Sequence, residues 1–223
     1  MARGRSQASR FSVPYRALGA LGVIALFLVV ASAIDTHVAA QVAQWRGPVL
    51  DGLVDLLNPI GSGVTLLLMC AALGLVCHRL RRSRLHDAAW LASLAFAGAG
   101  LIEFGLKHLV GRPRPDSALP ALLLLGPSFV PDIDSFPSGH ATSVFTVATV
   151  FASFYPRLAW PLYLLAAAVA LGRVYLGRHY VSDVLAGALI GILVARWLLG
   201  HRRRIVSWMR IWMRIDAVGR FPR

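Results

Sequence analysis

Charged residues are scarce in this chain, and acidic residues are the scarcer kind. Only 15% of the 223 residues are charged, with 10 acidic against 23 basic, and there is one glutamate, Glu103, and one lysine, Lys107. Hydrophobic residues make up 57% of the sequence. This balance is too apolar for an ordinary soluble domain of this size, so the sequence predicts that a lipid bilayer surrounds most of the protein.

Cysteine is also scarce. Cys70 and Cys77 are the only two cysteines, and they lie seven residues apart in one apolar run, which is not the spacing of a metal site. We interpret both as small buried hydrophobic side chains. We therefore expect no metal ion and no other cofactor in the functional site.

The net charge of +13 would suit a nucleic-acid-binding protein if the basic residues formed a stripe on a soluble fold. In this chain the arginines instead lie between long apolar runs. Nucleic acid is therefore not an expected partner, whereas the lipid bilayer is.

Six apolar runs are long enough to cross a membrane as helices, since about 17 or more residues suffice. They lie near residues 17–34, 60–77, 88–109, 139–155, 158–175 and 181–199. Prolines agree with these limits, because Pro59 and Pro137 precede the second and fourth runs. The first run has the basic flank of a signal peptide but is longer than a usual signal core, so we interpret it as an uncleaved anchor. The sequence thus predicts an all-α bundle of six transmembrane helices.

The placement of arginine predicts how the bundle is oriented, because cytoplasmic segments retain an excess of basic residues. Basic clusters occupy the N-terminal segment, residues 79–84, the turn at Arg157 and the tail from Arg196 onward. With six spans these segments all fall on one side, which puts both termini in the cytoplasm. The remaining six cations are expected on the outer face: Arg46, Lys107, Arg112, Arg114, Arg173 and Arg178.

The chain divides into a membrane part and a tail. We expect residues 1–200 to form one membrane-embedded domain and residues 201–223 to form a basic amphipathic cytoplasmic tail, in which Ile205, Trp208, Met209 and Trp212 recur at helical spacing. A second, short amphipathic helix is predicted on the outer surface over residues 49–57.

Three groups of polar residues lie at helix ends on the predicted outer face, where charges near the membrane core are unfavourable and call for an explanation. The groups are Lys107 followed after six residues by Arg114-Pro115, then Pro137-Ser138-Gly139-His140, and then Arg173, His179 and Asp183. Hydropathy and the arginine distribution place all three groups on the same side without reference to the motifs themselves.

The cations of these groups suit a phosphate, which carries about two negative charges. Arg114 and Arg173 can each bind phosphate oxygens through paired hydrogen bonds, and Lys107 adds a compact charge. Ser138 and Gly139 open a helix, whose free N–H groups and dipole favour an anion, and the missing glycine side chain allows close approach. We expect an anion cradle in which three cations replace the electrostatic role of a metal.

Two histidines and an aspartate are the candidate reacting groups. Asp183 lies four residues after His179, so on one helical face its carboxylate can accept the proton of one ring nitrogen and leave the other free as a nucleophile. His140, from another helix, can protonate the departing oxygen. His179 must then begin neutral and His140 protonated, which predicts a bell-shaped dependence of activity on pH.

Together the three groups resemble the motifs of the type 2 phosphatidic acid phosphatase and haloperoxidase superfamily. The motifs span residues 107–183, and the six-span layout extends the resemblance over roughly residues 15–200. The resemblance implies that His179 attacks phosphorus, that Asp183 orients it and that His140 is the general acid. It also implies the phosphate-binding set Lys107, Arg114, Ser138, Gly139 and Arg173. One position differs from the family motif: Gly172 precedes Arg173, where the family usually has serine. A hydroxyl hydrogen bond is therefore lost or supplied elsewhere.

The same resemblance implies a location and a substrate class. It implies a multi-pass protein of the bacterial cytoplasmic (inner) membrane whose active site faces the periplasm or exterior. The expected substrate is a lipid phosphate or diphosphate, with undecaprenyl diphosphate ahead of phosphatidylglycerophosphate, phosphatidic acid and a lipid A phosphate.

Three further functions are compatible with such a site. The haloperoxidase branch holds vanadate in the same cradle, but its members are soluble. A lipid phosphotransferase would pass the phosphoryl group to an alcohol, and a lipid-binding or transport protein would be non-catalytic; both stay open. The sequence predicts no oligomeric state.

The surroundings of the site also carry expectations. Glu103 lies one turn before Lys107, so an ion pair is expected to hold the lysine towards the site. Arg112 and Arg178 either touch a second phosphate or are generic surface charges, and we favour the second interpretation. The segment from residue 116 to 136 is either a lid or an ordinary loop.

Overall fold

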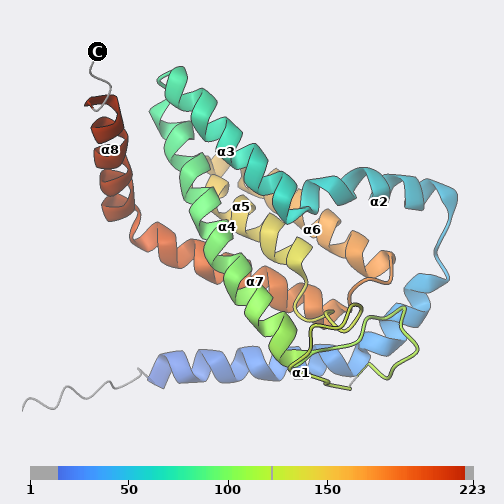
Figure 1. Cartoon of the computed structure of the whole chain (residues 1–223). Helices are drawn as coiled ribbons and strands as arrows, with labels where there is room; N and C mark the ends of the chain where they lie inside the picture. Colours follow the sequence, from blue (N-terminus) through green and yellow to red (C-terminus); the bar gives the residue numbers. More distant parts are fainter. Residues whose placement is uncertain (1–14, 122, 219–223) are drawn as a thin grey trace, which may run out of the picture.

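Helices are the only regular elements in the part of the chain that the computed structural model describes, residues 15–121 and 123–218 (Figure 1). In chain order they are α1 (Tyr15–Ala43), α2 (Pro48–Gly61), α3 (Gly63–Arg79), α4 (Ser83–Val110), α5 (Gly139–Phe154), the 3-10 helix η1 (Pro156–Leu158), α6 (Ala159–Tyr175), α7 (Val181–Gly200) and α8 (Arg202–Val218). The prediction of an all-α fold is confirmed for these residues.

Most of the predicted apolar runs fall on single helices, and the two predicted amphipathic helices are α2 and α8. The run near residues 60–77 instead crosses a break at Ser62 between α2 and α3, because Pro59 lies inside α2 and does not begin a new helix. By length and composition, three helical segments of the described chain can cross a membrane: α4, η1 together with α6, and α7. The pair α2 and α3 makes a fourth only if its 55° bend lies within one span. Because α5 has 16 residues, it is shorter than these spans. A membrane protein with several apolar helices is therefore supported, and the count of six spans stays a prediction.

Helix α5 is the centre of the bundle and packs against α3, α4, α6 and α7 (Figure 1). Its buried side chains are small, being alanine, valine, serine and threonine. The hydroxyl groups find partners within the helix, as where Thr146 Oγ1 donates to the Thr142 carbonyl at 2.6 Å. The hydroxyl donors of the helix are thus satisfied by its own backbone, as suits an apolar environment.

The backbones of α5 and α7 touch where glycine replaces a side chain. A Cβ at Gly187 would lie 2.4 Å from the Ser138 carbonyl oxygen, and one at Gly191 would lie 2.5 Å from that of Thr142. Two small residues four apart are the spacing at which membrane helices approach closely. Because the contacts advance together along both helices, α5 and α7 run parallel and begin side by side, with the Ser138 N–H donating to the Asp183 carbonyl at 3.0 Å.

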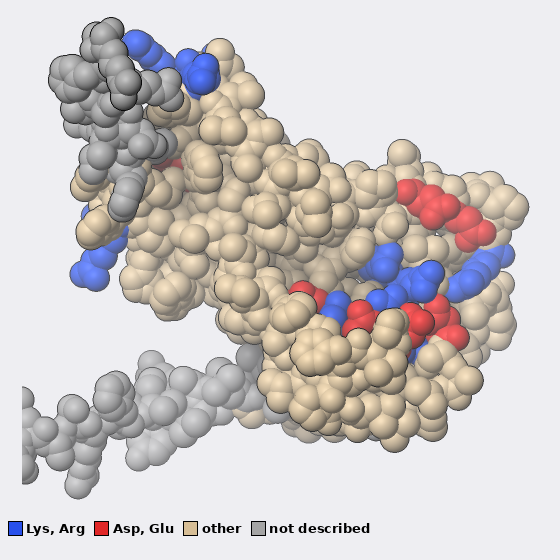
Figure 2. All heavy atoms as spheres, viewed as in Figure 1, with Lys and Arg blue, Asp and Glu red and all other residues tan. Residues whose placement is uncertain are grey.

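The segments that carry the predicted site meet at one end of the bundle. Helices α5 and α7 begin there, while α4 and α6 end there with Lys107 and Arg173 in their last turns. The end of α5 and the start of α4 meet at the opposite end, where the Arg84 guanidinium lies 4.9 Å from the centre of the Tyr155 ring. Figure 2 shows charged side chains gathered at these two ends, with a neutral surface between them.

The loop between α4 and α5 folds back over the end of α4. The Leu125 N–H donates to the Gly111 carbonyl at 2.9 Å, and the neighbouring backbone makes further bonds of this kind to α4. Leu124 and Phe129 of this loop are 63% and 77% exposed. The base of the loop is therefore attached to α4 while apolar side chains face outward, which favours the ordinary-loop interpretation over a freely moving lid.

Replacing Gly191 by alanine is expected to force α5 and α7 apart, because the new Cβ would lie 2.5 Å from the Thr142 carbonyl oxygen and 2.9 Å from the Thr146 backbone nitrogen, neither of which can move aside freely. Overpacking of this kind costs about 1–3 kcal/mol. We expect a lower thermal unfolding temperature for the purified protein in detergent. Gly100→Ala is the matched control, since a Cβ there meets nothing within 4 Å. Equal unfolding temperatures for the two variants would contradict the close contact.

Candidate active site

All eight predicted site residues lie at the shared end of the bundle. They come from the ends of α4 and α6, the starts of α5 and α7, and the segments that connect these helices: Lys107, Arg114, Ser138, Gly139, His140, Arg173, His179 and Asp183. In Figure 2 the charged groups at this end gather between α2 and the α4–α5 loop. The three sequence motifs therefore form one site in space.

The expected ion pair between Glu103 and Lys107 is present. Lys107 Nζ lies 2.8 Å from Glu103 Oε1 and 3.9 Å from Asp134 Oδ2. The lysine side chain is 17% exposed, so the pair is largely shielded from water. Glu103 thus holds the single lysine of the chain towards the site from one helical turn away.

Arg114 is held by a carboxylate that the sequence motifs do not include. Its Nε and Nη2 atoms donate to the two oxygens of Asp134 at 2.8 and 3.0 Å. Burial opposes charge on both groups, but the hydrogen bonds and charge attraction of the pair lower the pKa of Asp134 and raise the pKa of Arg114. An incoming anion must bind the remaining edge of the guanidinium or displace Asp134.

Arg173 is held by a neutral group instead. Its Nη1 donates to Asn58 Oδ1 at 2.6 Å. Its Nε and the Ser138 hydroxyl oxygen are buried and have no hydrogen-bond partner within the described residues. Unpaired buried polar groups are rare in proteins. Two of them at the same end of the bundle fit a site that binds an anion.

The N-terminus of α5 faces the same place. Its cap residue, Ser138, makes no side-chain capping bond, so the first-turn N–H groups are not satisfied by the cap. Helix α7 begins beside it, and the positive ends of both helix dipoles therefore favour negative charge here. A Cβ at Gly139 would lie 3.0 Å from Glu103 Oε1, so a larger residue would press on the carboxylate that holds Lys107.

His179 lies in the link between α6 and α7 and is only 3% exposed. Its Nδ1 lies 2.8 Å from the Ser135 carbonyl oxygen, which can only accept, so Nδ1 carries the proton. Burial, followed by the positive charges of Lys107 and Arg173, lowers the pKa of His179 well below its ordinary value. The ring is therefore neutral with an unprotonated Nε2, which is the form that a nucleophile requires.

Asp183 reaches His179 indirectly. Its Oδ2 lies 4.0 Å from His179 Nδ1, which is too long for the direct hydrogen bond expected from the four-residue spacing. Oδ2 instead accepts from the Ser135 hydroxyl at 2.6 Å and from the Tyr180 N–H at 2.8 Å. The spacing rule does not apply because α7 begins at Val181, after His179. Ser135, which no sequence motif singles out, thus connects the two residues: its hydroxyl binds the aspartate and its carbonyl binds the histidine.

Arg112 is buried, so the favoured expectation of a generic surface charge is wrong. It is 4% exposed and donates from Nη1 to Asp183 Oδ1 at 2.6 Å and from Nη2 to Asp35 Oδ2 at 2.9 Å. Burial alone would lower the pKa of Arg112, but the charges and hydrogen bonds of Asp183 and Asp35 raise it. Because the Arg112 guanidinium is bound to both carboxylates, its role is structural and it is not directed at a second phosphate.

The Arg112 network also ties α1 to the start of α7. The Ser182 N–H donates to Asp35 Oδ1 at 3.0 Å, and the Ser182 hydroxyl donates to the other oxygen of the same carboxylate. The Arg112 guanidinium lies 4.2 Å from the centre of the Tyr180 ring. These contacts fix the residues immediately after His179.

His140 lies in the first turn of α5 and is partly buried. Its ring packs against α2, since a Cβ at Gly61 would lie 2.7 Å from His140 Cδ2. The positive charges of Arg173 and Lys107 act on it, which places it beside the cations. Its assignment as the group that protonates the leaving oxygen stays a prediction.

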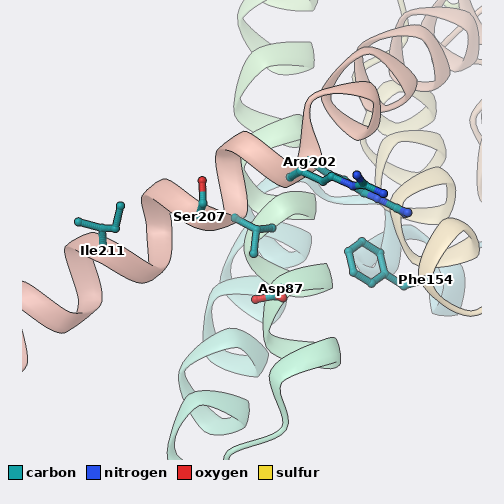
Figure 3. Close-up of a pocket in the computed structure, with 7 residues that line it drawn as sticks. Asp87, Phe154, Arg202, Ser207 and Ile211 are labelled. Carbon is teal, nitrogen blue, oxygen red and sulfur yellow. The ribbon is translucent and has the colours of Figure 1, made fainter.

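A pocket of about 540 Å³ lies elsewhere, under α8, and contains none of the predicted site residues. Figure 3 shows Asp87 and Phe154 on the side that faces α8. Its lining consists of Asp87, Phe154, Arg202, Arg203, Val206, Ser207 and Ile211. Across residues 15–121 and 123–218, no group of three or more histidine, cysteine, aspartate or glutamate side chains is arranged to hold a metal ion.

Comparison with known proteins gives the family. The sequence pattern of the PAP2 superfamily matches residues 88–206, more than half of the chain. The lipid A 1-phosphatase of Rhizobium etli is 36% identical over 113 residues, 46% of this chain and 47% of that protein. The putative undecaprenyl-diphosphatase YbjG of Escherichia coli is 40% identical over 132 residues, 53% of this chain and 63% of that protein. This chain therefore spans about half to two thirds of the length of these relatives.

A solved structure agrees with the sequence comparison. The transmembrane PAP2 type phosphatidylglycerolphosphate phosphatase of Bacillus subtilis matches this fold with a TM-score of 0.63 at 25% identity, over 82% of this chain and 96% of that one. The chain belongs to the PAP2 superfamily, in its membrane phosphatase branch, as the motifs implied.

Removing the buried cation is expected to destabilise the protein strongly. Arg112→Gln leaves Asp35 and Asp183 buried without their positive partner, and breaking such a pair costs about 3–5 kcal/mol. Arg178→Gln is the matched control, because Arg178 is 46% exposed and pairs with Asp116 at 3.2 Å on the surface, where a pair is worth about 0–1 kcal/mol. Thermal unfolding in detergent measures both. If Arg112→Gln were as stable as Arg178→Gln, the structural role of the network would be refuted.

Proposed function

We propose that this protein is a membrane lipid phosphatase that works through a phosphohistidine intermediate on His179, without a metal ion. The observation that carries the proposal is the meeting of a neutral, buried histidine with three cations and two helix N-termini at one end of the bundle. Membership of the PAP2 superfamily supports the reaction class.

In the proposed first step the substrate phosphate binds Lys107, Arg114 and Arg173 together with the N–H groups at the start of α5. These groups compensate the charge that spreads over the phosphoryl oxygens in the transition state. His179 Nε2 attacks phosphorus and the bond from phosphorus to the leaving oxygen breaks; this is the lipid alcohol oxygen in a monophosphate and the bridging oxygen in a diphosphate. His140 donates a proton to the leaving oxygen, which matters most for a monophosphate because a free alkoxide is a poor leaving group.

The second step regenerates the histidine. His140, now neutral, removes a proton from water, and the water oxygen attacks the phosphorus of the phosphohistidine. Inorganic phosphate leaves and His179 returns to its neutral form. Asp183 acts on this cycle from a distance, because it holds Ser135, whose carbonyl keeps the proton of His179 on Nδ1.

The proposed substrate is an amphiphile, with undecaprenyl diphosphate as the leading candidate. Two exposed apolar surfaces next to the site support a lipid: the α4–α5 loop with Phe129, 77% exposed, and α2 with Leu56, 72% exposed. Similarity to YbjG supports the diphosphate. The relatives named as lipid A 1-phosphatase and phosphatidylglycerolphosphate phosphatase make those lipid phosphates the next candidates, with phosphatidic acid after them.

The proposed orientation has six spans, both termini in the cytoplasm and the site at the outer face of the bacterial cytoplasmic membrane. In this layout α1, α3 and α5 complete the spans formed by α4, α6 and α7, residues 1–200 form the membrane domain, and residues 201–223 form the tail. The separation of the site from the arginines of residues 79–84 and of α8 supports it, since cytoplasmic segments collect basic residues.

Phosphate release from purified protein in detergent tests the proposed reaction. In excess chelator we expect wild type to release phosphate from lipid phosphates or diphosphates, and His179→Ala to lose about 10³-fold or more, because the nucleophile is gone. His201→Ala should match wild type, since this exposed histidine binds the Trp197 carbonyl at the end of α7 away from the site.

Each contrary outcome has a definite meaning. Loss of wild-type activity in chelator would overturn metal-free catalysis. Equal release by His179→Ala would overturn the assigned nucleophile. Transfer of phosphate to an added alcohol without free phosphate would make the protein a phosphotransferase, and lipid binding that survives in His179→Ala without any wild-type turnover would favour a non-catalytic protein.

A further inference from the structure

One face of α2 forms a wall of the candidate site. Val54, Asn58 and Gly61 are spaced by four and then three residues, so they lie on the same face of this helix. They touch, in that order, Gly172, Arg173 and His140. The opposite face of α2 is apolar and exposed, as at Leu53 and Leu56. The helix therefore joins the site to the apolar surface of the protein.

Arg173 is restrained by this wall without losing its charge. Asn58 accepts one hydrogen bond from Nη1 at 2.6 Å, and the amide is neutral. The other two cations of the site are each bound to a carboxylate, Lys107 to Glu103 and Arg114 to Asp134. Arg173 thus offers an anion the least neutralised positive charge of the three, and its buried Nε has no partner within the described residues.

Gly172 explains how α2 comes so close to Arg173. A Cβ at position 172 would lie 3.1 Å from Val54 Cγ1, which is tighter than ordinary van der Waals contact. The chain departs from its family at this residue, where serine is usual. Because residue 172 has no side chain, α2 packs directly on α6. The chain has no serine hydroxyl at this position, and the Asn58 amide oxygen accepts a hydrogen bond from Arg173 instead.

We propose that Asn58 is a positioning residue for phosphate binding: it aims the Arg173 guanidinium at the phosphate while leaving its charge uncompensated. Holding a long side chain in its bound conformation reduces the entropy lost on binding, and a neutral acceptor does so without competing for the cation. This inference rests on the proposed function, because it requires phosphate to bind beside Arg173.

Two variants of Asn58 separate orientation from charge. Asn58→Ala removes the hydrogen bond, and because bonds to charged groups are strong we expect inorganic phosphate to bind about tenfold more weakly. Asn58→Asp keeps the size and the hydrogen bond but neutralises Arg173, so we expect weaker phosphate binding than in Asn58→Ala. A purely structural role for Asn58 would leave the aspartate variant close to wild type.

The measurement is the dissociation constant of inorganic phosphate by calorimetry on the full chain in detergent, with thermal unfolding as a check of folding. Val49→Ala is the matched control on the same helix, because this side chain is 77% exposed and lies at the other end of α2 from Asn58. It should bind phosphate as wild type does.

A second pair of variants tests the packing of α2 on α6. Gly172→Ser should weaken phosphate binding by displacing Val54 and with it Asn58. The double variant Gly172→Ser/Val54→Ala should regain most of the affinity, because the smaller residue makes room for the serine. Full affinity in Gly172→Ser alone would contradict the tight contact.

The failure of this inference differs from failure of the proposed function. If the wild-type protein neither bound nor released phosphate, the proposed function itself would be wrong. Normal phosphate binding in wild type with unchanged affinity in both Asn58 variants would overturn only the role of Asn58. If Asn58→Ala does not fold, the near-isosteric Asn58→Asp decides alone, and unchanged affinity in that variant overturns the inference.

Discussion

The backbone contact between α5 and α7 is the constraint on which the rest of the site depends. Gly187 and Gly191 let the two helices run in parallel at a distance that no side chain would permit. Their N-termini therefore begin side by side, which places Ser138 of one motif against Asp183 of another. Both helix dipoles point their positive ends at the same place. A pair of small residues on α7 thus brings together two helix N-termini and two motifs that are far apart in the sequence.

The buried charges divide into two groups with different partners. Arg112 is enclosed by Asp35 and Asp183, and this group connects α1, the α4–α5 loop and α7. Lys107, Arg114 and Arg173 are less buried and have partners that leave donors available. Burial of a charge is tolerated only with good compensation, so the first group is suited to fixing structure. The second group keeps positive charge at the mouth of the site, and this difference could not be read from the arginines themselves, which look alike in the sequence.

Hydropathy was enough to predict where most helices lie, because apolar runs of membrane length leave the backbone few alternatives. The proline positions were less reliable, since Pro59 lies inside α2 and the break to α3 falls at Ser62. The motif residues lie together at one end of the bundle, and their roles in the site stay a prediction. Partners between distant residues were not predictable: Asp35 and Arg112 are 77 residues apart, and Asn58 and Arg173 are 115 apart. The expected bond from Asp183 to His179 failed for a local reason, since α7 begins only at Val181. The carbonyl of Ser135 took its place, and a backbone oxygen leaves no mark in the sequence.

The central claim, that His179 carries the phosphoryl group between substrate and water, is tested most directly by trapping the intermediate. The protein would be mixed with a lipid phosphate labelled in the reacting phosphoryl group, quenched in alkali within the first turnover, and digested for mass spectrometry. We expect label on His179 in wild type and in His201→Ala, and none in His179→Ala. Phosphate release without label on any residue, or label on a residue other than His179, would contradict the claim.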